Sequence, residues 1–270
     1  MRKSDTTFAG SIPALYDRYL APLIFEPYAA ELAQRLQDVK QGDLLEIAAG
    51  TGVVTRALAH SLPHSVNIVA TDLNQPMLDY AAARFPHERP VTWRQANALE
   101  LPFNDGAFDV AVCQFGVMFF PDKPAAYREA RRVLTPGGRF LFSVWDRIEE
   151  NEVTHAAVSG VAGLFPHDPP QFMSRTPHGY HDKERIVNEL HRAGFSNVRV
   201  ETVQHRSRAA SPRDPAIGLC QGSPLRNEIE ARDATRVEEA TDAAAAAVTA
   251  RFGSGPIDGK MQAHVFTASA

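Results

Sequence analysis

A glycine-rich turn between an apolar run and a helix is the first stretch of the sequence whose residue types suggest chemistry. Leu44 to Ile47 is apolar except for Glu46, and Gly50 and Gly52 follow shortly after it. Apolar residues then recur at helical spacing from Val53 onward. Glycine tolerates a positive φ and has no Cβ to keep a ligand from the backbone. In doubly wound α/β sheets ligands bind beyond the carboxyl ends of strands, so this turn predicts a ligand site.

A second candidate is the acidic residue Asp72, which ends a predicted strand twenty residues after Gly52. A carboxylate in this place can accept hydrogen bonds from both hydroxyl groups of a ribose. The alternative roles are a solvated acid at a strand end or a helix cap, since Asn74 is the predicted start of the next helix.

Strands and helices alternate through the first half of the chain, which predicts a parallel α/β sheet with right-handed crossovers. The predicted strands are 44–47, 66–72, 91–95, 108–115 and 139–145. Asp122 is the predicted cap of the helix that the turn 135–138 ends. An N-terminal helix over 11–37, interrupted at Pro22 and Pro27, precedes the sheet.

After Trp145 this alternation lapses. The expected elements are a helix over 148–164, a segment over 165–180 rich in Pro, His and Gly, a helix from Asp182 to Gly194, a strand over 197–203, helices over 211–252 with Ser223 and Pro224 beginning one of them, and a last strand over 260–268.

Composition excludes several classes of function. The 270 residues are 44% hydrophobic with a net charge of −4, and such a chain has no electrostatic footprint for nucleic acid. No apolar run approaches the roughly 18 residues of a membrane span, and the first ten residues lack the apolar segment of a secretory signal. Cys113 and Cys220 form neither a CxxC motif nor a metal-ligand pair. We therefore expect a cytoplasmic protein with no metal site, no membrane span and no nucleic-acid partner. Nothing in the sequence specifies an oligomeric state.

Four ordered motifs together resemble those of class I S-adenosylmethionine (SAM)-dependent methyltransferases of the type 11 kind, the group that includes the ubiquinone and menaquinone C-methyltransferases. The motifs are LLEIAAGTG (44–52), ATDLNQPML (70–78), NALELPF (97–103) with FDVAVCQFGVMFF (108–120), and EARRVLTPGGRFLFSVWD (129–146). The ordered set is far more specific than any one motif.

The resemblance implies a Rossmann-like, mostly parallel sheet of seven strands in the order 3-2-1-4-5-7-6, with the last strand antiparallel. It also implies one methyltransferase domain over 1–270 with a cofactor-binding core at 40–146. The segments 1–39, 148–181 and 211–252 would then be helical cap or lid insertions on the substrate side.

The family's cofactor contacts fall on matching positions of this chain. Glu46 would orient the glycine loop and the cofactor's amino group, and Asp72 would accept from the ribose hydroxyls. The full set of implied cofactor-binding residues is Glu46, Ala48, Gly50, Gly52, Asp72, Leu73, Met77, Asn97, Ala98 and Gln114.

Two positions depart from the family pattern. Ala48 stands where the family usually has Gly, and we expect it to fit only if its φ is negative. Asn97 stands where the family often has Asp, so it would accept from the adenine amino group as a neutral and weaker partner.

Two rival functions remain open at this stage. A nicotinamide-dependent oxidoreductase would also use Asp72, but its fingerprint needs a third glycine where this chain has Thr55. A non-catalytic SAM-binding protein is the other rival, because methyl transfer needs few protein groups.

The acceptor side of the predicted site carries fewer signals. Methyl transfer from a sulfonium depends mainly on alignment and exclusion of water, and a base helps when the acceptor is a hydroxyl or an acidic carbon. The candidates for such a base are His178, Tyr180 and His181, which follow the predicted core; packing, capping or surface roles are the alternatives. Phe165, Phe172, Met173 and Tyr180 suggest a small, partly apolar acceptor in an enclosed pocket.

Overall fold

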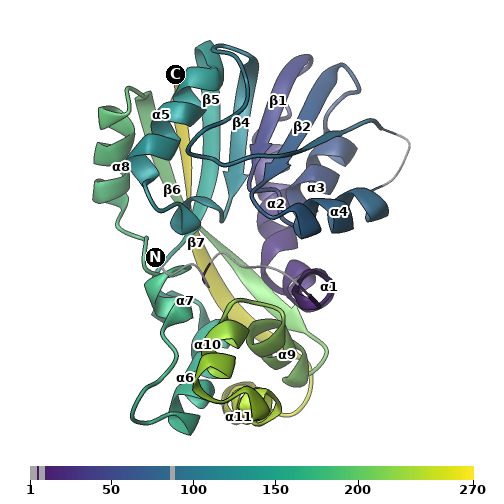
Figure 1. Cartoon of the computed structure of the whole chain (residues 1–270), viewed down its shortest axis with the longest axis vertical. Coiled ribbons are helices and arrows are strands. Elements are labelled where there is room, and N and C mark those ends of the chain that lie inside the picture. The colour runs from purple at the N-terminus through teal and green to yellow at the C-terminus, as the bar shows by residue number, and fades with distance from the viewer. Residues whose placement is uncertain (1–4, 6–9, 86–88) are drawn as a thin grey trace. The chain divides into compact units, whose positions relative to one another are not determined.

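The fold is built on a seven-stranded sheet with the strand order β3-β2-β1-β4-β5-β7-β6 (Figure 1). This order, mostly parallel with β7 antiparallel, confirms the predicted fold class. The strands are β1 (Gly42–Ile47), β2 (Val66–Asp72), β3 (Thr92–Gln95), β4 (Phe108–Gln114), β5 (Leu134–Trp145), β6 (Ser196–Ala209) and β7 (Ile257–Ser269).

The computed structural model describes residue 5, residues 10–85 and residues 89–270, and the chain divides into two units. Unit 1 consists of Met1–Pro27, Trp145–Tyr180 and Gln204–Ala263, and unit 2 of Tyr28–Val144, His181–Val203 and His264–Ala270. Strands β6 and β7 contribute residues to both units. In the described part of the chain, no helix combines the length and the apolar character that crossing a membrane requires.

Strand register decides which side chains of unit 2 share a face of the sheet. Glu46 of β1 pairs with Val112 of β4, and Val112 pairs with Leu141 of β5. Because side chains alternate along a strand, these residues lie on one face while Phe140 and Phe142 lie on the other.

Helices cover both of these faces. Thr55 of α3 (Val53–Ser61) donates a hydrogen bond to Glu46, which places α3 on the Glu46 face. On the opposite face, Tyr127 of α5 (Lys123–Val133) packs on Phe140 and Phe142, whose ring centroids lie 6.3 and 5.6 Å away. The remaining helices assigned wholly or largely to unit 2 are α2 (Glu26–Gln34), α4 (Gln75–Arg84), the short 3-10 helix η3 (Val117–Phe119) and α8 (Lys183–Arg192).

Unit 1 is mainly helical. In it α11 packs against both α6 and α9, and α9 also contacts the π-helix η2. Its helices are α1 (Ile12–Leu15), η2 (Tyr16–Phe25), η4 (Ile148–Glu150), α6 (Glu152–Leu164), α7 (Phe172–Arg175), α9 (Arg213–Gln221), α10 (Leu225–Asp233), η5 (Ala234–Arg236) and α11 (Val237–Phe252).

Helix capping agrees in part with the sequence predictions. Asp122 and Asp182 accept from the backbone N–H groups of Ala125 and Arg185 at 2.9 and 3.1 Å, which confirms both caps. Asn74 occupies the N-cap position of α4, but its side chain makes no capping bond. The helix near Ser223 begins one residue later than predicted, with Pro224 at the N-cap.

Two predicted boundaries are wrong for identifiable reasons. The N-terminal helix continues without a gap from Ile12 to Gln34, because Pro22 lies within a π-helical stretch that accommodates it. Strand β5 begins at Leu134 rather than Arg139. Phe108 pairs with Leu134 while Val110 already pairs with Arg139, so the residues 135–138 form an irregularity in the strand instead of preceding it.

Candidate functional site: a cofactor cradle at the ends of three strands

The loop after β1 has three residues in the left-handed region. The φ values of Ala48, Gly50 and Gly52 are +60°, +57° and +78°. The expectation that Ala48 fits only with a negative φ is therefore wrong: this alanine adopts the conformation that the family's glycine would favour, at a cost of about 1–2 kcal/mol. Strained residues of this kind cluster at ligand sites.

The two glycines of this loop are required for different reasons. A Cβ on Gly50 would make only an ordinary contact, 3.7 Å from the Met77 Cε, so its side of the loop is open. A Cβ on Gly52 would lie 3.1 Å from the Trp93 ring and 3.2 Å from the Ala81 Cβ. Packing against α4 and β3 therefore explains Gly52 without a ligand.

Asp72 is held by backbone groups at the end of β2. Its Oδ2 accepts from the Gly50 N–H at 2.9 Å, and its Oδ1 accepts from the Asn74 N–H at 2.8 Å. Burial raises the pKa of this carboxyl even though those N–H groups favour the charged form. Each carboxylate oxygen can accept more than one hydrogen bond. Asp72 can therefore accept further hydrogen bonds, such as those of ribose hydroxyls, while it holds the Gly50 and Asn74 N–H groups.

Glu46 lies beneath the same loop and is 2% exposed. Its Oε2 accepts from the Thr55 hydroxyl at 2.6 Å, at the position where a dinucleotide fingerprint would have its third glycine. Burial, with the nearby Asp72 carboxylate, raises the pKa of Glu46 to about 8. The sequence identified Thr55 only as a missing glycine, whereas the structure shows it as a partner of Glu46.

The residues predicted to face the adenine differ in exposure. Leu73 is 51% exposed, while Met77 and Ala98 are buried. Asn97 is exposed, and its Oδ1 accepts from the Leu99 N–H at 3.1 Å, an interaction that keeps the amide in a local turn. Leu73 therefore offers an exposed apolar side chain next to Asp72 in the sequence.

Sequence reasoning missed the turn after β4. Gln114 ends that strand, and the next residue, Phe115, has a φ of +53° and donates its N–H to the Ser143 carbonyl at 3.0 Å. A Cβ on Gly116 would meet the Ala48 Cβ at 2.6 Å, so the turns after β1 and β4 pack directly on each other. The signal for this turn was the Phe-Gly pair that follows the predicted strand.

The predicted cofactor residues thus gather in unit 2, around the carboxyl ends of β1, β2 and β4 and the adjoining loops. The predicted acceptor-side residues do not share one unit. His178 and Tyr180 belong to unit 1, where both are buried, and His181 belongs to unit 2.

A separate cavity of about 730 Å³ in unit 2 contains none of these residues. Three arginines, Arg128, Arg131 and Arg132, line it together with Asp105 and Glu129. Arg132 forms ion pairs with both acids. This cavity therefore offers no clear charge preference for a ligand.

Comparison with known proteins agrees with this geometry. The methyltransferase domain model of the type 11 family matches residues 45–142. A demethylmenaquinone methyltransferase from Lactobacillus johnsonii is 29% identical over 177 residues, which cover 59% of this chain and 70% of the relative. The chain is a class I SAM-dependent methyltransferase.

Further similarities support the assignment of this methyltransferase to its family. A ubiquinone/menaquinone biosynthesis C-methyltransferase from a Shewanella species is 28% identical over 172 residues, which cover 57% of this chain and 66% of the relative. The fold matches that of the phosphoethanolamine N-methyltransferase 2 of Haemonchus contortus in complex with SAM, with a TM-score of 0.60, 19% identity and coverage of 95% of this chain and 56% of the other. The cofactor of this methyltransferase is SAM, and the nicotinamide alternative is set aside.

Proposed function

We propose that this methyltransferase transfers the methyl group of SAM to a small, partly apolar molecule, with a hydroxylated aromatic ring of the quinol type as the first candidate. The observation that carries the choice of acceptor is the similarity to a protein named for demethylmenaquinone, which extends over 70% of that relative. In this proposal the acceptor contacts come from the segments 1–39, 148–181 and 211–252.

The cofactor would be held by the residues that line the cradle in unit 2. Asp72 would accept from the ribose hydroxyls, and Leu73 would cover one face of the adenine. Glu46 and the backbone carbonyl of Gln114 would serve the amino-acid end, and Asn97 and Ala98 the adenine edge. Ala48, Gly50, Gly52 and Met77 would shape the surface against which the cofactor lies.

The fit of SAM to this cradle rests on charge as well as shape. SAM supplies an already activated methyl group on a positively charged sulfur. Two buried acids, Glu46 and Asp72, lie beneath the loop, and the pKa of each is raised by burial. A bound cation would favour their charged forms, so a cationic ligand relieves an unfavourable feature of the ligand-free protein.

The remaining work of the protein is alignment and exclusion of water, which can supply a large share of the rate of a displacement reaction. The aromatic and apolar residues of the 165–180 segment suit an acceptor of mixed character. Phe165, Phe172, Met173 and Tyr180 are all buried, as expected for residues that shape a wall rather than a surface loop.

Two measurements test the proposal in sequence. Titration calorimetry should detect binding of SAM and S-adenosylhomocysteine and no binding of NAD(H) or NADP(H). Incubation with methyl-labelled SAM should then label demethylmenaquinol that carries one prenyl unit, and should leave phosphoethanolamine unlabelled. Labelling of phosphoethanolamine alone would redirect the acceptor to amines.

A further inference from the structure

The turn after β4 holds a large side chain in a backbone conformation that such residues rarely adopt. Phe115 follows the last residue of β4 and has a φ of +53°. Among residues other than glycine, only Asn and Asp visit the left-handed region routinely. Residues held in that region cluster at ligand sites. The fold therefore keeps Phe115 in this conformation against the preference of the residue itself.

The conformation of Phe115 determines where the carbonyl group of the preceding residue points. The Phe115 N–H donates to the Ser143 carbonyl of β5 at 3.0 Å. In a planar trans peptide the C=O and the following N–H point in opposite directions, so the Gln114 carbonyl points away from β5. The strand on the other side of β4 is β1. The Gln114 carbonyl therefore points to the side of the sheet on which the glycine loop follows β1.

The turn itself lies directly against that loop. A Cβ on Gly116 would be only 2.6 Å from the Ala48 Cβ. The register of β4 with β1 ends at Val112, two residues before Gln114. A carbonyl oxygen has two lone pairs, so it can accept from a ligand in addition to a group of the protein. The Gln114 carbonyl is thus placed beside the cofactor cradle and can serve a donor that is bound there.

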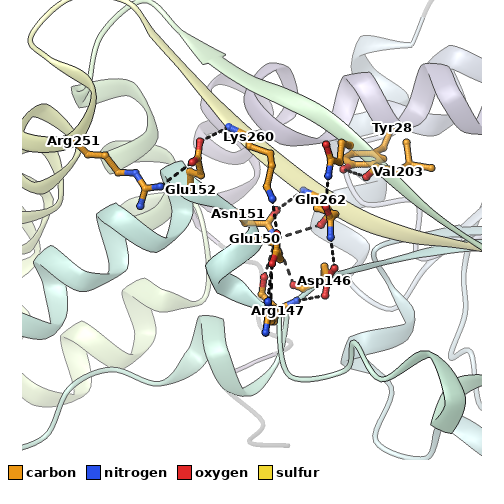
Figure 2. Close-up of polar contacts among 11 residues, drawn as sticks. Tyr28, Asp146, Arg147, Glu150, Asn151, Glu152, Val203, Arg251, Lys260 and Gln262 are labelled. Carbon is orange, nitrogen blue, oxygen red and sulfur yellow. Dashed lines mark hydrogen bonds and ion pairs between the residues drawn. The ribbon is translucent and has the colours of Figure 1, made fainter.

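The ring of Phe115 is held by a different part of unit 2. It makes an edge contact with the ring of Tyr28, with the centroids 5.2 Å apart and an angle of 90° between the planes. The Tyr28 hydroxyl donates to the Val203 carbonyl of β6 at 3.0 Å (Figure 2). Tyr28 and Phe115 are 1% and 5% exposed, and all three residues belong to unit 2. The strained residue therefore packs on a tyrosine that is itself hydrogen-bonded to the sheet.

We propose that Phe115 and Tyr28 are positioning residues for the amino-acid end of SAM, because they keep the Gln114 carbonyl directed at the cofactor's ammonium group. A carbonyl that accepts from an ammonium forms a charge-assisted hydrogen bond, and such a bond weakens when its direction changes. The ligands that the turn selects are adenosine derivatives whose side chain ends in a cationic amine. The inference rests on the contact proposed above between the Gln114 carbonyl and the amino-acid end of SAM.

Two adenosine ligands that differ in one group measure this selection. Decarboxylated S-adenosylhomocysteine keeps the amino group, and butylthioadenosine carries a methyl group in its place. In titration calorimetry the wild type should bind the amine at least roughly tenfold more tightly, the scale of one hydrogen bond to a charged group. A preference below twofold would show that the Gln114 contact is wrong. Neither result depends on the methyl acceptor, so a failure to methylate demethylmenaquinol leaves this test intact.

Substitutions at Phe115 separate the backbone conformation from the ring. Phe115→Asn and Phe115→Thr both replace the ring with a small polar side chain, but asparagine tolerates the left-handed region and β-branched threonine rarely adopts it. The threonine variant should lose at least roughly threefold of the preference for the amine, and the asparagine variant should lose less. The affinity of both for butylthioadenosine should stay within about twofold of the wild type. A wild-type preference in a folded threonine variant would overturn the proposal.

Tyr28 provides a second test that leaves Phe115 in place. Tyr28→Leu removes the edge contact and should also lower the preference for the amine, whereas Tyr28→Phe removes only the hydroxyl and should keep more of it. Circular dichroism shows which variants fold, and this pair decides the matter if the threonine variant does not. An unchanged preference in folded Tyr28→Leu protein would overturn the proposal. An equal loss of affinity for both ligands would overturn it as well, because general damage to the cradle would then be the cause.

Discussion

The cofactor cradle in unit 2 and the network of hydrogen bonds that joins Asp146, His178 and Gln262 in unit 1 are built from contacts of different range in the sequence. In the cradle, Glu46 bonds to a residue 9 positions away and Asp72 to residues 2 and 22 positions away. In the network, the hydrogen bonds of Asp146 with His178 and Gln262 span 32 and 116 positions. Local contacts leave a motif in the sequence, whereas the distant ones leave separate residues with no recognisable spacing.

The largest expected effect lies on the acceptor side and would sharpen this comparison. Tyr180→Phe and His181→Ala should lower turnover of the true acceptor, by at least roughly tenfold for a residue that contacts it in the transition state, with little change in SAM affinity. Steady-state kinetics with calorimetry of S-adenosylhomocysteine would show the split. If both variants keep wild-type turnover, acceptor contacts should be sought in 211–252.

The second effect concerns the cradle. Asp72→Ala removes a charged acceptor for two ribose hydroxyls, and hydrogen bonds to charged groups contribute about 1.5–3 kcal/mol each. The affinity for SAM should fall at least roughly tenfold by calorimetry, since about 1.4 kcal/mol is a factor of ten. Asp72→Asn is the matched control, because it keeps one oxygen acceptor and should retain part of the affinity. Unchanged affinity in a folded Ala variant would show that Asp72 only accepts the hydrogen bonds of the Gly50 and Asn74 N–H groups and does not bind the ribose.

A third effect is a dependence of the folding stability on pH through Glu46. Its carboxyl has a pKa of about 8 in the folded protein against an ordinary value of 4.5. Between these values the folded state holds a proton that the unfolded chain has lost, so the free energy of unfolding falls as the pH rises, by up to about 1.4 kcal/mol per unit. Glu46→Gln should flatten this slope in denaturant titrations between about pH 5 and pH 8.

The same residue should couple SAM binding to proton release. A cationic ligand favours the charged carboxylate, so the affinity of the wild type should rise with pH up to about 8 and then level off. The affinity of Glu46→Gln should lack this rise. A parallel rise in both proteins would assign the dependence to another group.

Much of the fold and part of the cradle could be predicted because the sequence records them locally. The alternation of apolar runs and helices indicated the sheet, and the spacing of the glycine loop and Asp72 indicated the ligand side of β1 and β2. The left-handed φ of Ala48 could not be predicted, because propensity disfavours it and only the packing around the loop enforces it. The unbroken helix at Pro22 could not be predicted for a similar reason. Local rules predict a break at proline, whereas the π-helical stretch from Tyr16 to Phe25 contains it.

The smallest expected effect tests that strain directly. Ala48→Gly should raise the free energy of unfolding by about 1 kcal/mol, because glycine adopts the left-handed region without the Cβ clash. Ala49→Gly is the control, since Ala49 is not among the residues with positive φ, and it should be neutral or destabilising. Equal effects of the two substitutions in denaturant unfolding would show that Ala48 is not strained.

The close approach of Ala48 to Gly116 also limits which substitutions the chain can accept at position 116. A methyl group on residue 48 already fills the place that a Cβ on residue 116 would need, 2.6 Å away, and the Cys113 sulfur lies 2.7 Å from that same place. A side chain at position 116 therefore fits only when position 48 is glycine and position 113 carries a smaller side chain. The effect of a substitution at position 116 thus depends on which residues occupy positions 48 and 113, and the three positions are energetically coupled.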